Sequence, residues 1–357
     1  VKLSGENAID AGGPAREIFS SLITEMMNDR IGIFTFNPNR NHCIKDTNQE
    51  DLIPNKYLIR CSLIDKYMND SLFMHLYSHR FIYAGALIAI CIVSKLPQPM
   101  KLPSFVWEYL SYEKVSIESI YEVDHYFEEL IKNAENIQNE INLNNPIDFE
   151  SLFLHYFVIK DSFDKVVELV SSGSQKRVTK DNLNEFIELA KNYRMHEFDN
   201  ELYELKKGFD MIMCNKDIIN ILHPHELKLL ACGESNCSVE QMKKLTIVNA
   251  KQEEMKEMFW KVIESFTVEE RMLFIKFSSG NLGLPAPGLR WEKDLIVNIL
   301  NKESGRRLAL AHTCFSSVDI PFFESEEELS KILKMSINFS GLITDSYENP
   351  EEVSDFL

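Results

Sequence analysis

Apolar residues recur at helical spacing along most of this chain. One long amphipathic helix is predicted where a single face carries Met255, Met258, Phe259, Val262, Ile263 and Phe266. Three more helix starts are indicated by a Ser or Thr that stands three residues before a Glu or Gln, as in a capping box. These pairs are Thr267 with Glu270, Ser325 with Glu328, and Ser238 with Gln241.

Other predicted elements are shorter or less regular. The run 81–93 is apolar throughout and predicts a buried helix, and residues 223–233 predict one with a proline in its first turn and a glycine after its end. Residues 308–315 alternate weakly and predict a strand that leads into a loop. Residues 272–280 fit either the end of a helix or the start of a strand.

Polar stretches interrupt these elements. Residues 246–250 lead into a segment without core periodicity, and we expect a hinge there. The asparagine-rich residues 135–146 predict a loop at a subdomain edge, and the acidic residues 344–357 predict a flexible tail. Because 45% of the 357 residues are hydrophobic, the chain has enough apolar material for two or three domain-like units.

The net charge of −17 at neutral pH narrows the classes of partner. Nucleic-acid binding requires Lys and Arg along the phosphate backbone, and no long basic stripe occurs, so we expect no nucleic-acid partner. The charge fits either solubility or the steering of a partner with a basic face. The most apolar run, 81–93, is too short to span a bilayer, so we expect no membrane insertion.

Seven cysteines occur at irregular spacing, at positions 43, 61, 91, 214, 232, 237 and 314. An odd count of this kind is typical of a reduced intracellular protein rather than of a disulfide framework. We therefore expect a location in the cytoplasm, the nucleus or both. The chain begins with Val1 and shows no signal peptide, so we expect it to be part of a longer protein.

Cys314 lies outside any clear amphipathic pattern, beside polar residues and a predicted loop. A cysteine thiolate is a strong nucleophile even where only a small fraction of the thiol is ionised. If the backbone is extended, His312 and Cys314 point to one face, where the imidazole would hold or deprotonate the thiol. The local residues leave two readings open: a nucleophile, or a buried cysteine that packs as a small hydrophobic side chain.

Zinc-binding residue types cluster at His223, His225, Cys232 and Cys237. Their spacing fits the usual zinc pairs only loosely, and the proline between the histidines indicates a helix start rather than a ligand loop. The glycine-rich residues 278–288 lack the Lys-Ser/Thr of a phosphate-binding loop and predict a structured turn. We expect neither a metal ion nor a cofactor.

Four segments together resemble the HECT domain of ubiquitin ligases, in the order and spacing of that family. They are AIDAGGPAREIF at 8–19, HPHELKLLACG at 223–233, MFWKVIESFTVEERMLFIKFSSG at 258–280, and LALAHTCFSSVDIPFFESEEEL at 308–329. The last segment contains the His-Thr-Cys-Phe catalytic loop and is highly specific. The resemblance covers the chain from about Gly5 to Ile343 and implies that Cys314 is the catalytic thiol.

The resemblance also implies an α+β fold with two lobes. Residues 1–245 would form a mostly helical N-lobe, in which about 120–209 would bind the ubiquitin-conjugating enzyme (E2). Residues 246–250 would be the hinge, and residues 251–343 a smaller α/β C-lobe with the catalytic cysteine. A hinge in this place would let the cysteine meet different partners in successive steps.

The implied function is that of a HECT-type E3 ubiquitin ligase. Such an enzyme accepts ubiquitin from the conjugating enzyme as a thioester and passes it to lysines of protein substrates, which regions outside this chain would recognise. His312, Thr313 and Phe315 match the neighbours of the catalytic cysteine in the family's loop. As exposed apolar contacts for the conjugating enzyme we expect Phe127, Leu130, Phe157 and Tyr193.

The chain departs from the family near its end, where Gly341-Leu342 replaces a common Gly-Phe pair. Either Leu342 or Phe356 would take the place of the aromatic residue, which leaves the role of the acidic tail open. Two rival functions remain. A cysteine hydrolase would need a distant histidine and an orienting Asn or Asp, for which no local signature occurs. A catalytically inactive HECT-like interaction module is disfavoured by the intact His-Thr-Cys-Phe.

Overall fold

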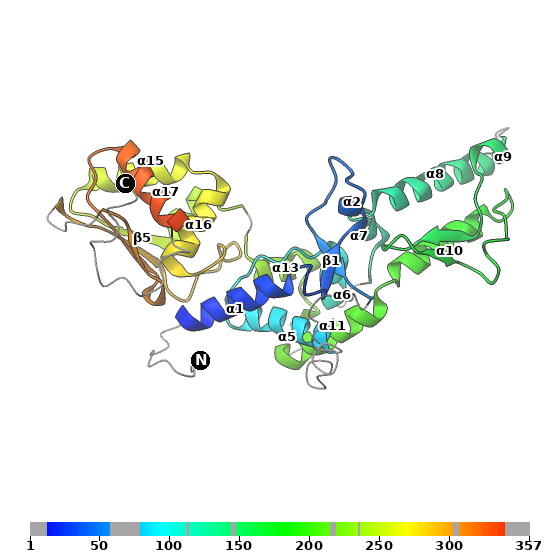
Figure 1. Ribbon diagram of the computed structural model, residues 1–357, viewed down its shortest axis with the longest axis horizontal. Helices are drawn as coiled ribbons and strands as arrows, with labels where there is room; N and C mark the ends of the chain where they lie inside the picture. The colour runs from blue at the N-terminus through cyan, green and yellow to red at the C-terminus, as the bar shows by residue number, and fades with distance from the viewer. Residues whose placement is uncertain are drawn as a thin grey trace. The chain divides into compact units, whose positions relative to one another are not determined.

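The computed structural model describes residues 13–57, 79–111, 114–143, 148–214, 219–234, 236–302 and 307–339, which form two compact units (Figure 1). The helical unit consists of Ile23–Ile90 and Met100–Lys228; the sheet unit consists of Val1–Leu22, Cys91–Pro99 and Leu229–Leu357. Helices and small sheets occur together, so the predicted α+β fold is confirmed. Within the described ranges, no helix is long and apolar enough to cross a membrane.

The body of the helical unit contains the buried helix predicted from the apolar run. This helix is α5 (Arg80–Val93), and its backbone closely approaches that of α11 (Asp199–Met213). A Cβ atom at Gly85 would lie 1.8 Å from the carbonyl oxygen of Leu205, so only glycine fits there. The remaining elements of the body are β1 (Phe34–Phe36), α2 (Pro38–Asn41), β2 (Leu52–Pro54), α6 (Ser104–Leu110) and α7 (Ile117–Tyr121).

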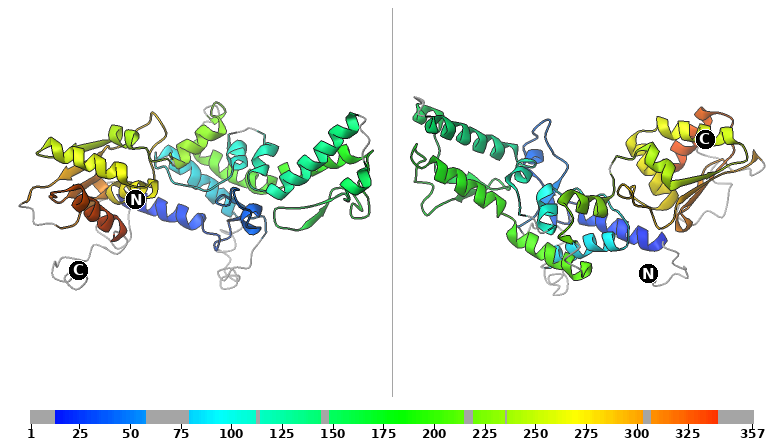
Figure 2. Two further views of the ribbon diagram at one scale, coloured as in Figure 1. Left: turned by 90° about the horizontal axis from the view of Figure 1, so that it is seen from above. Right: turned by 180° about the vertical axis from the view of Figure 1, so that it is seen from behind.

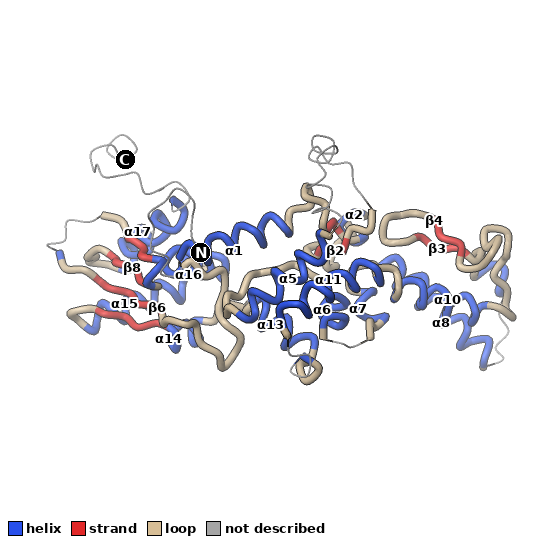
Figure 3. The backbone as a smooth tube through the Cα atoms, turned by 90° about the horizontal axis from the view of Figure 1, so that it is seen from below, coloured by secondary structure: helices blue, strands red, loops and turns tan. Residues whose placement is uncertain are grey.

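A smaller part of the helical unit is formed by α8 (His125–Asn142) and α10 (Leu183–Met195), which lie side by side (Figure 3). The loop predicted at 135–146 is therefore wrong over most of its length. The helix continues to Asn142 because Asp124 caps its start and buried side chains recur on one face, at Phe127, Ile131, Ala134 and Ile137. This part also contains α9 (Phe149–Leu152), β3 (Val158–Lys160) and β4 (Val166–Glu168).

The end expected for the conjugating-enzyme-binding subdomain, at residue 209, falls inside α11. That helix packs on α6 and against the backbone of α5, so it belongs to the body of the unit. The part formed by α8, α9, β3, β4 and α10 ends where α10 ends, near Met195. We call this part, residues 125–195, the α8–α10 subdomain.

Buried charges connect this subdomain to the body of the helical unit. Arg194 is buried, and its guanidinium donates hydrogen bonds to Asp124 at 2.7 Å and to Ser162 at 2.9 Å and also pairs with Glu197 at 2.8 Å. Lys56, which follows β2, pairs with Asp161 at 3.1 Å and with Glu197 at 2.8 Å. Because each charge meets an opposite one, the network tolerates burial.

The sheet unit contains a four-stranded sheet whose order is β5-β6-β8-β7. Parallel pairing joins β5 (Thr246–Asn249) to β6 (Leu295–Ile299) and β6 to β8 (Ser317–Ile320), whereas β7 (Leu310–His312) is antiparallel to β8. Alternate residues of β6 and β8 are buried in the core of this unit. Three helices that come after β5 in the chain contribute to the same core, and Figure 2 shows them along the sheet. These helices are α15 (Glu253–Ser265), α16 (Val268–Ser279) and α17 (Glu326–Phe339).

The three helix starts predicted from Ser and Thr are confirmed. Thr267 and Glu270 form a complete capping box at the start of α16. This helix continues to Ser279, so residues 272–279 are helical rather than a strand. The hydroxyl groups of Ser325 and Ser238 each accept a hydrogen bond from the backbone N–H three residues later. Those two serines cap α17 and α14 (Val239–Leu245). The helix predicted at 223–233 is α13 (Pro224–Cys232), and α1 spans Gly13–Met26.

The hinge expected at residues 246–250 is a strand instead. Thr246–Asn249 is β5, paired in register with Leu295–Asn298 of β6. The N-lobe boundary at residue 245 is wrong for the same reason, because Cys237, Met242 and Leu245 are buried in the core of the sheet unit. A four-residue strand has little room for a periodic signal, so the pattern alone resembled a linker. The tail expected at 344–357, with Leu342 and Phe356, lies outside the described residues.

Candidate active site on the loop after strand β7

Cys314 lies in a single turn of 3-10 helix, η2 (Thr313–Phe315), which connects β7 to β8. Strand pairing brings His312 opposite Ser317, so only four residues form the connection. Ser316 closes it in the left-handed conformation, with φ of 49°, and its N–H donates to the carbonyl of Thr313 at 3.1 Å. Ser316 is buried, and its carbonyl accepts from the N–H of Ile296 in β6 at 2.9 Å. The turn that presents Cys314 is therefore tied to the sheet.

Three residues belong to, adjoin or contact the turn that carries the thiol. His312, at the end of β7, has its Nε2 atom 3.3 Å from Oδ2 of Asp319 in β8. Lys293 donates a hydrogen bond of 3.3 Å to the backbone carbonyl of Cys314. Phe315 is 64% exposed, so its ring does not fill the core. His312, Phe315 and Thr313, which lies in the same turn, are the loop residues singled out in the sequence, whereas Lys293 was not.

The argument that His312 and Cys314 share a face of an extended strand does not hold. The strand ends at His312, and Cys314 lies in the helical turn that follows. The thiol is half-buried, which favours neither a core cysteine nor a fully solvated one. His312 stands immediately before the turn and Cys314 in its middle, so strand alternation does not relate the two side chains.

Two other cysteines differ from Cys314 in a way that matters for chemistry. Cys91 and Cys237 are fully buried, and burial raises the pKa of Cys91 to about 12 and that of Cys237 to about 11. A raised pKa keeps a thiol protonated and unreactive. All six described cysteines, Cys314 included, have free thiols.

The structure does not assemble the residues considered for zinc. His223 and His225 stack on each other, with ring centroids 5.9 Å apart at the start of α13. Cys237 is buried in the core of the sheet unit. Among the described residues, no three His, Cys, Asp or Glu side chains gather in a group that would hold a metal ion.

The expectation for the conjugating-enzyme contacts needs correction. Phe127 and Phe157, expected to be exposed, are only 4% and 0% exposed. The ring of Phe127 lies under the Arg194 guanidinium at 4.7 Å, and Phe157 makes an edge contact with Phe186. Leu130 and Tyr193 are half-buried. Both phenylalanines lie in the small core of the subdomain. The spacing of apolar residues along the chain does not show which of them other parts of the fold will cover.

The subdomain instead exposes apolar side chains that the sequence analysis did not single out. Leu152 and Leu154 are 54% and 70% exposed, and Tyr156 is also exposed. They alternate with Phe153 and Phe157, which are buried. The sequence carries a signal for this exposure. In SLFLHYF both alternating sets of positions are apolar, whereas burial of one face requires only one apolar set. We call Leu152, Leu154 and Tyr156 the exposed apolar strip.

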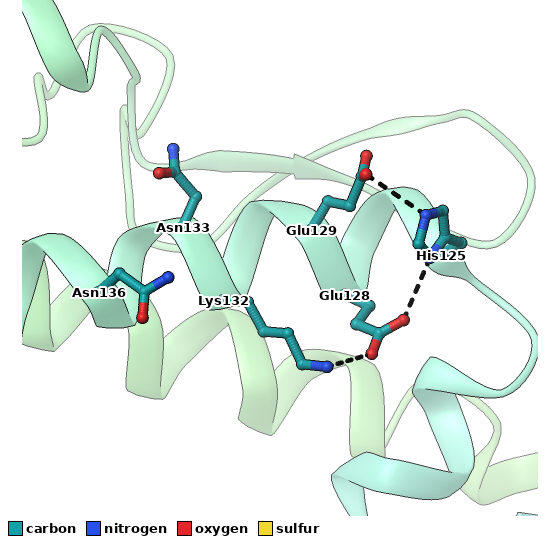
Figure 4. A pocket seen from close by; sticks show the side chains of 6 residues that line it. All are labelled: His125, Glu128, Glu129, Lys132, Asn133 and Asn136. Atoms are coloured by element: carbon teal, nitrogen blue, oxygen red, sulfur yellow. Dashed lines mark hydrogen bonds and ion pairs between the residues drawn. The ribbon is translucent and has the colours of Figure 1, made fainter.

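Two surface hollows lie on the α8–α10 subdomain. One follows a single face of α8 and contains the ion pairs that His125 makes with Glu128 and Glu129, and Lys132 with Glu128 (Figure 4). Ion pairs between residues three or four positions apart are common on the exposed face of a helix. The other has a volume of about 440 Å³, and its lining includes Leu130 together with His42, the residue that follows α2.

Comparison with known proteins gives the family. The model of the HECT-domain (ubiquitin-transferase) family matches residues 20–342, well over half of the chain. The chain therefore belongs to the HECT-domain family of ubiquitin transferases, as the resemblance predicted. Cys314, with the turn that carries it, lies inside the matched region.

Individual relatives are E3 ubiquitin-protein ligases. The chain is 26% identical to human HERC2 over 353 residues, which is 97% of this chain and 7% of that protein. It is 24% identical to the ligase RSP5 of Emericella nidulans over 94% of this chain and 38% of that protein. The probable ligase HERC3 of Homo sapiens is 24% identical, over 96% of this chain and 30% of its own length. The chain thus spans well under half of each of these relatives.

Proposed function

We propose that this chain is the catalytic domain of an E3 ubiquitin ligase that carries ubiquitin as a thioester on Cys314. The observation that supports it most directly is the placement of Cys314. In a chain of the ubiquitin-transferase family, this thiol stands half-exposed on a turn that hydrogen bonds tie to the sheet. His312 and Lys293 bring polar groups to the same turn.

In the first step, the Cys314 thiolate attacks the carbonyl carbon of the thioester between ubiquitin and the conjugating enzyme. A new sulfur–carbon bond forms, and the cysteine of the conjugating enzyme leaves as a thiolate that takes up a proton. One thioester replaces another, so the step is nearly neutral in energy and depends mainly on the relative placement of the two sulfur atoms.

In the second step, a substrate lysine amine attacks the thioester on Cys314. A nitrogen–carbon bond forms, the carbon–sulfur bond breaks, and the amine loses a proton. We assign the proton to His312, the imidazole nearest to Cys314 in the chain. Replacing His312 with Gln then slows transfer from Cys314 but leaves binding unchanged, and an unchanged single-turnover rate would remove this assignment.

The conjugating enzyme is proposed to bind the α8–α10 subdomain. Leu130 and Tyr193 remain candidates for the contact, because part of each side chain reaches the surface. The exposed apolar strip joins them, since apolar side chains in water gain free energy when a partner covers them. Protein substrates are proposed to be recognised outside this chain, which spans only part of its relatives. The free thiols support a reducing compartment, the cytoplasm or nucleus.

A charging assay tests the proposed function. The chain is mixed with activating enzyme, a panel of conjugating enzymes, ATP and ubiquitin, and the products are separated on non-reducing gels. We expect an adduct larger by one ubiquitin that disappears with a thiol reductant and does not form with Cys314→Ala. Cys43→Ala is the matched control, because Cys43 is an exposed thiol outside the site. A folded chain that forms no adduct with any conjugating enzyme would favour the inactive interaction module.

A further inference from the structure

A chain of side-chain hydrogen bonds crosses all four strands of the sheet and ends at His312. Asn249 of β5 donates through Nδ2 to Oδ1 of Asn298 in β6 at 3.0 Å. Asn298 in turn donates through Nδ2 to Oδ1 of Asp319 in β8 at 3.0 Å. Oδ2 of Asp319 lies 3.3 Å from Nε2 of His312 in β7. We call these four side chains the polar row.

The strand register explains how these side chains meet. Asn249 pairs with Asn298, and Asn298 pairs with Asp319, so three of the four stand directly beside one another. The partner of Asp319 in β7 is Leu310, and His312 lies two residues further on, on the same side of the strand. The neighbours Val297 and Val318 are buried on the opposite side. The polar row therefore lies on the face turned away from the core.

Each member of the row determines the orientation of the next. The carboxylate of Asp319 only accepts hydrogen bonds, so the His312 nitrogen that faces it, Nε2, is the donor. A neutral imidazole with its proton on Nε2 has its lone pair on Nδ1. Asn298 occupies Oδ1 of Asp319 and leaves Oδ2 for His312, while Asn249 holds the amide of Asn298 in the orientation that makes this donation.

We propose that Asp319 is a positioning residue for ubiquitin transfer, which holds His312 with Nδ1 free to take the proton of the attacking lysine amine. The proposal rests on the proposed function of Cys314 and on the assignment of His312. Asn298 and Asn249 support Asp319 from the neighbouring strands. The row acts through the orientation of the imidazole.

The residue types of the row support a role in chemistry rather than in folding. Asn and Asp are among the residues least favoured in strands, yet they occupy matching positions of three adjacent strands here. Their backbone pairing does not require them, because Ile247 and Ile296 form a pair of the same two strands two positions earlier, on the same face of the sheet. Residue types that disfavour the secondary structure they occupy are expected at functional sites.

The experiment separates loading from discharge in the full 357-residue chain. The wild type, Asp319→Asn, His312→Gln and the double variant are charged with ubiquitin, and discharge is followed at increasing concentrations of free lysine. We expect Asp319→Asn to charge normally and to lower the maximal discharge rate about tenfold, which is less than the roughly hundredfold effect of losing a general base because His312 itself remains. The lysine concentration at half-maximal rate should not change. The double variant should be no slower than His312→Gln, because both changes disable one unit.

A spectroscopic readout reports on the imidazole itself. In the chain labelled with nitrogen-15 histidine, the ring signals of His312 are assigned by their absence in His312→Gln. We expect the neutral ring to carry its proton on Nε2 in the wild type and to become a mixture of both tautomers in Asp319→Asn. Should Asp319→Asn fail to fold, Asn298→Ser keeps the carboxylate but removes its support and is expected to shift the tautomers in the same direction.

Glu324→Gln is the matched control, since it changes another carboxylate of the same unit that pairs only with exposed Lys302. It should discharge at the wild-type rate. Three results would each overturn the positioning role alone. They are normal charging with unchanged discharge in Asp319→Asn, effects that multiply in the double variant, and an unchanged tautomer. A wild-type chain that does not charge would overturn the proposed function, and this role with it.

Discussion

Lys293 Nζ donates a hydrogen bond of 3.3 Å to the backbone carbonyl of Cys314, which joins the start of β6 to the turn that carries the thiol. Under the proposed function, the ammonium group adds a positive charge to the turn on which a thiolate and, later, a tetrahedral oxyanion would develop. The bond is exposed to solvent, so its effect is limited by screening.

We therefore expect Lys293→Met to slow charging of Cys314 about threefold, since an exposed hydrogen bond contributes about 0.5 to 1 kcal/mol. The measurement is the initial rate of thioester formation at low and at high salt. High salt should reduce the difference between variant and wild type. Lys302→Met, which changes a lysine of the same unit that pairs with Glu324, is the control and should charge at the wild-type rate.

Phe315 should be needed for activity but not for folding. Its ring is mostly exposed, so Phe315→Ala should change the free energy of unfolding by no more than about 0.5 kcal/mol. The same change should slow transfer, because an exposed aromatic side chain beside the nucleophile is placed to contact the ubiquitin that is carried. Urea unfolding and single-turnover discharge measure the two effects. Leu289→Ala, at another exposed apolar position of the same unit, serves as the control. A large stability loss in Phe315→Ala would contradict the exposed placement.

Alkylation should distinguish the cysteines of the folded chain. Iodoacetamide reacts with thiolates, and burial raises the pKa values of Cys91 and Cys237, so neither should be modified at pH 7.5 while the chain is folded. The exposed Cys43 and Cys214 and the half-buried Cys314 should be modified before them. Mass spectrometry of peptides taken over time checks the order. Rapid labelling of Cys237 without unfolding would show that the core of the sheet unit opens readily.

Arg194→Leu should destabilise the helical unit strongly. The substitution leaves Asp124 and Glu197 without the guanidinium that compensates their charges, and breaking a buried pair from one side costs about 3 to 5 kcal/mol. The urea midpoint of the helical unit should fall accordingly. Lys132→Leu, which removes an exposed pair with Glu128 on α8, is the control and should change stability little. Equal effects of the two substitutions would contradict the burial of Arg194.

The contribution of Asp161 to stability should depend on pH. Burial alone would raise its pKa, but hydrogen bonds from the N–H groups of Lys165 and Phe163, together with Lys56 and Tyr57, lower it below the ordinary 3.8. A lowered pKa means that the contribution is complete above the unfolded-state value and is lost as the pH falls through the folded-state value. Asp161→Asn should therefore be less stable than wild type at pH 7, and the difference should shrink towards pH 3.

Urea unfolding at both pH values measures this difference. Asp148→Asn is the control, because Asp148 lies outside the ion network. A stability difference between Asp161→Asn and wild type that stays constant with pH would show that the lost hydrogen bonds, rather than the charge, account for the effect.

The sequence by itself determined the helices that carry their own local signals. The capping box of Thr267 and Glu270 and the apolar run that forms α5 involve residues a few positions apart, so the chain need not be folded for them to be recognised. The His-Thr-Cys-Phe segment likewise pointed to Cys314 through residues that are consecutive in the chain.

Tertiary structure decided whatever depends on partners far away in the chain. Residues 246–249 form a strand because Leu295–Asn298 lies beside them, and Phe157 is buried because Phe186 and the Lys176 side chain pack against its ring. The contact of His312 with Asp319 depends on the antiparallel register of β7 and β8, which also sets the four-residue turn around Cys314. Local propensity acts over a few residues, whereas strand pairing, burial and the orientation of an imidazole are fixed by groups that only the folded chain brings together.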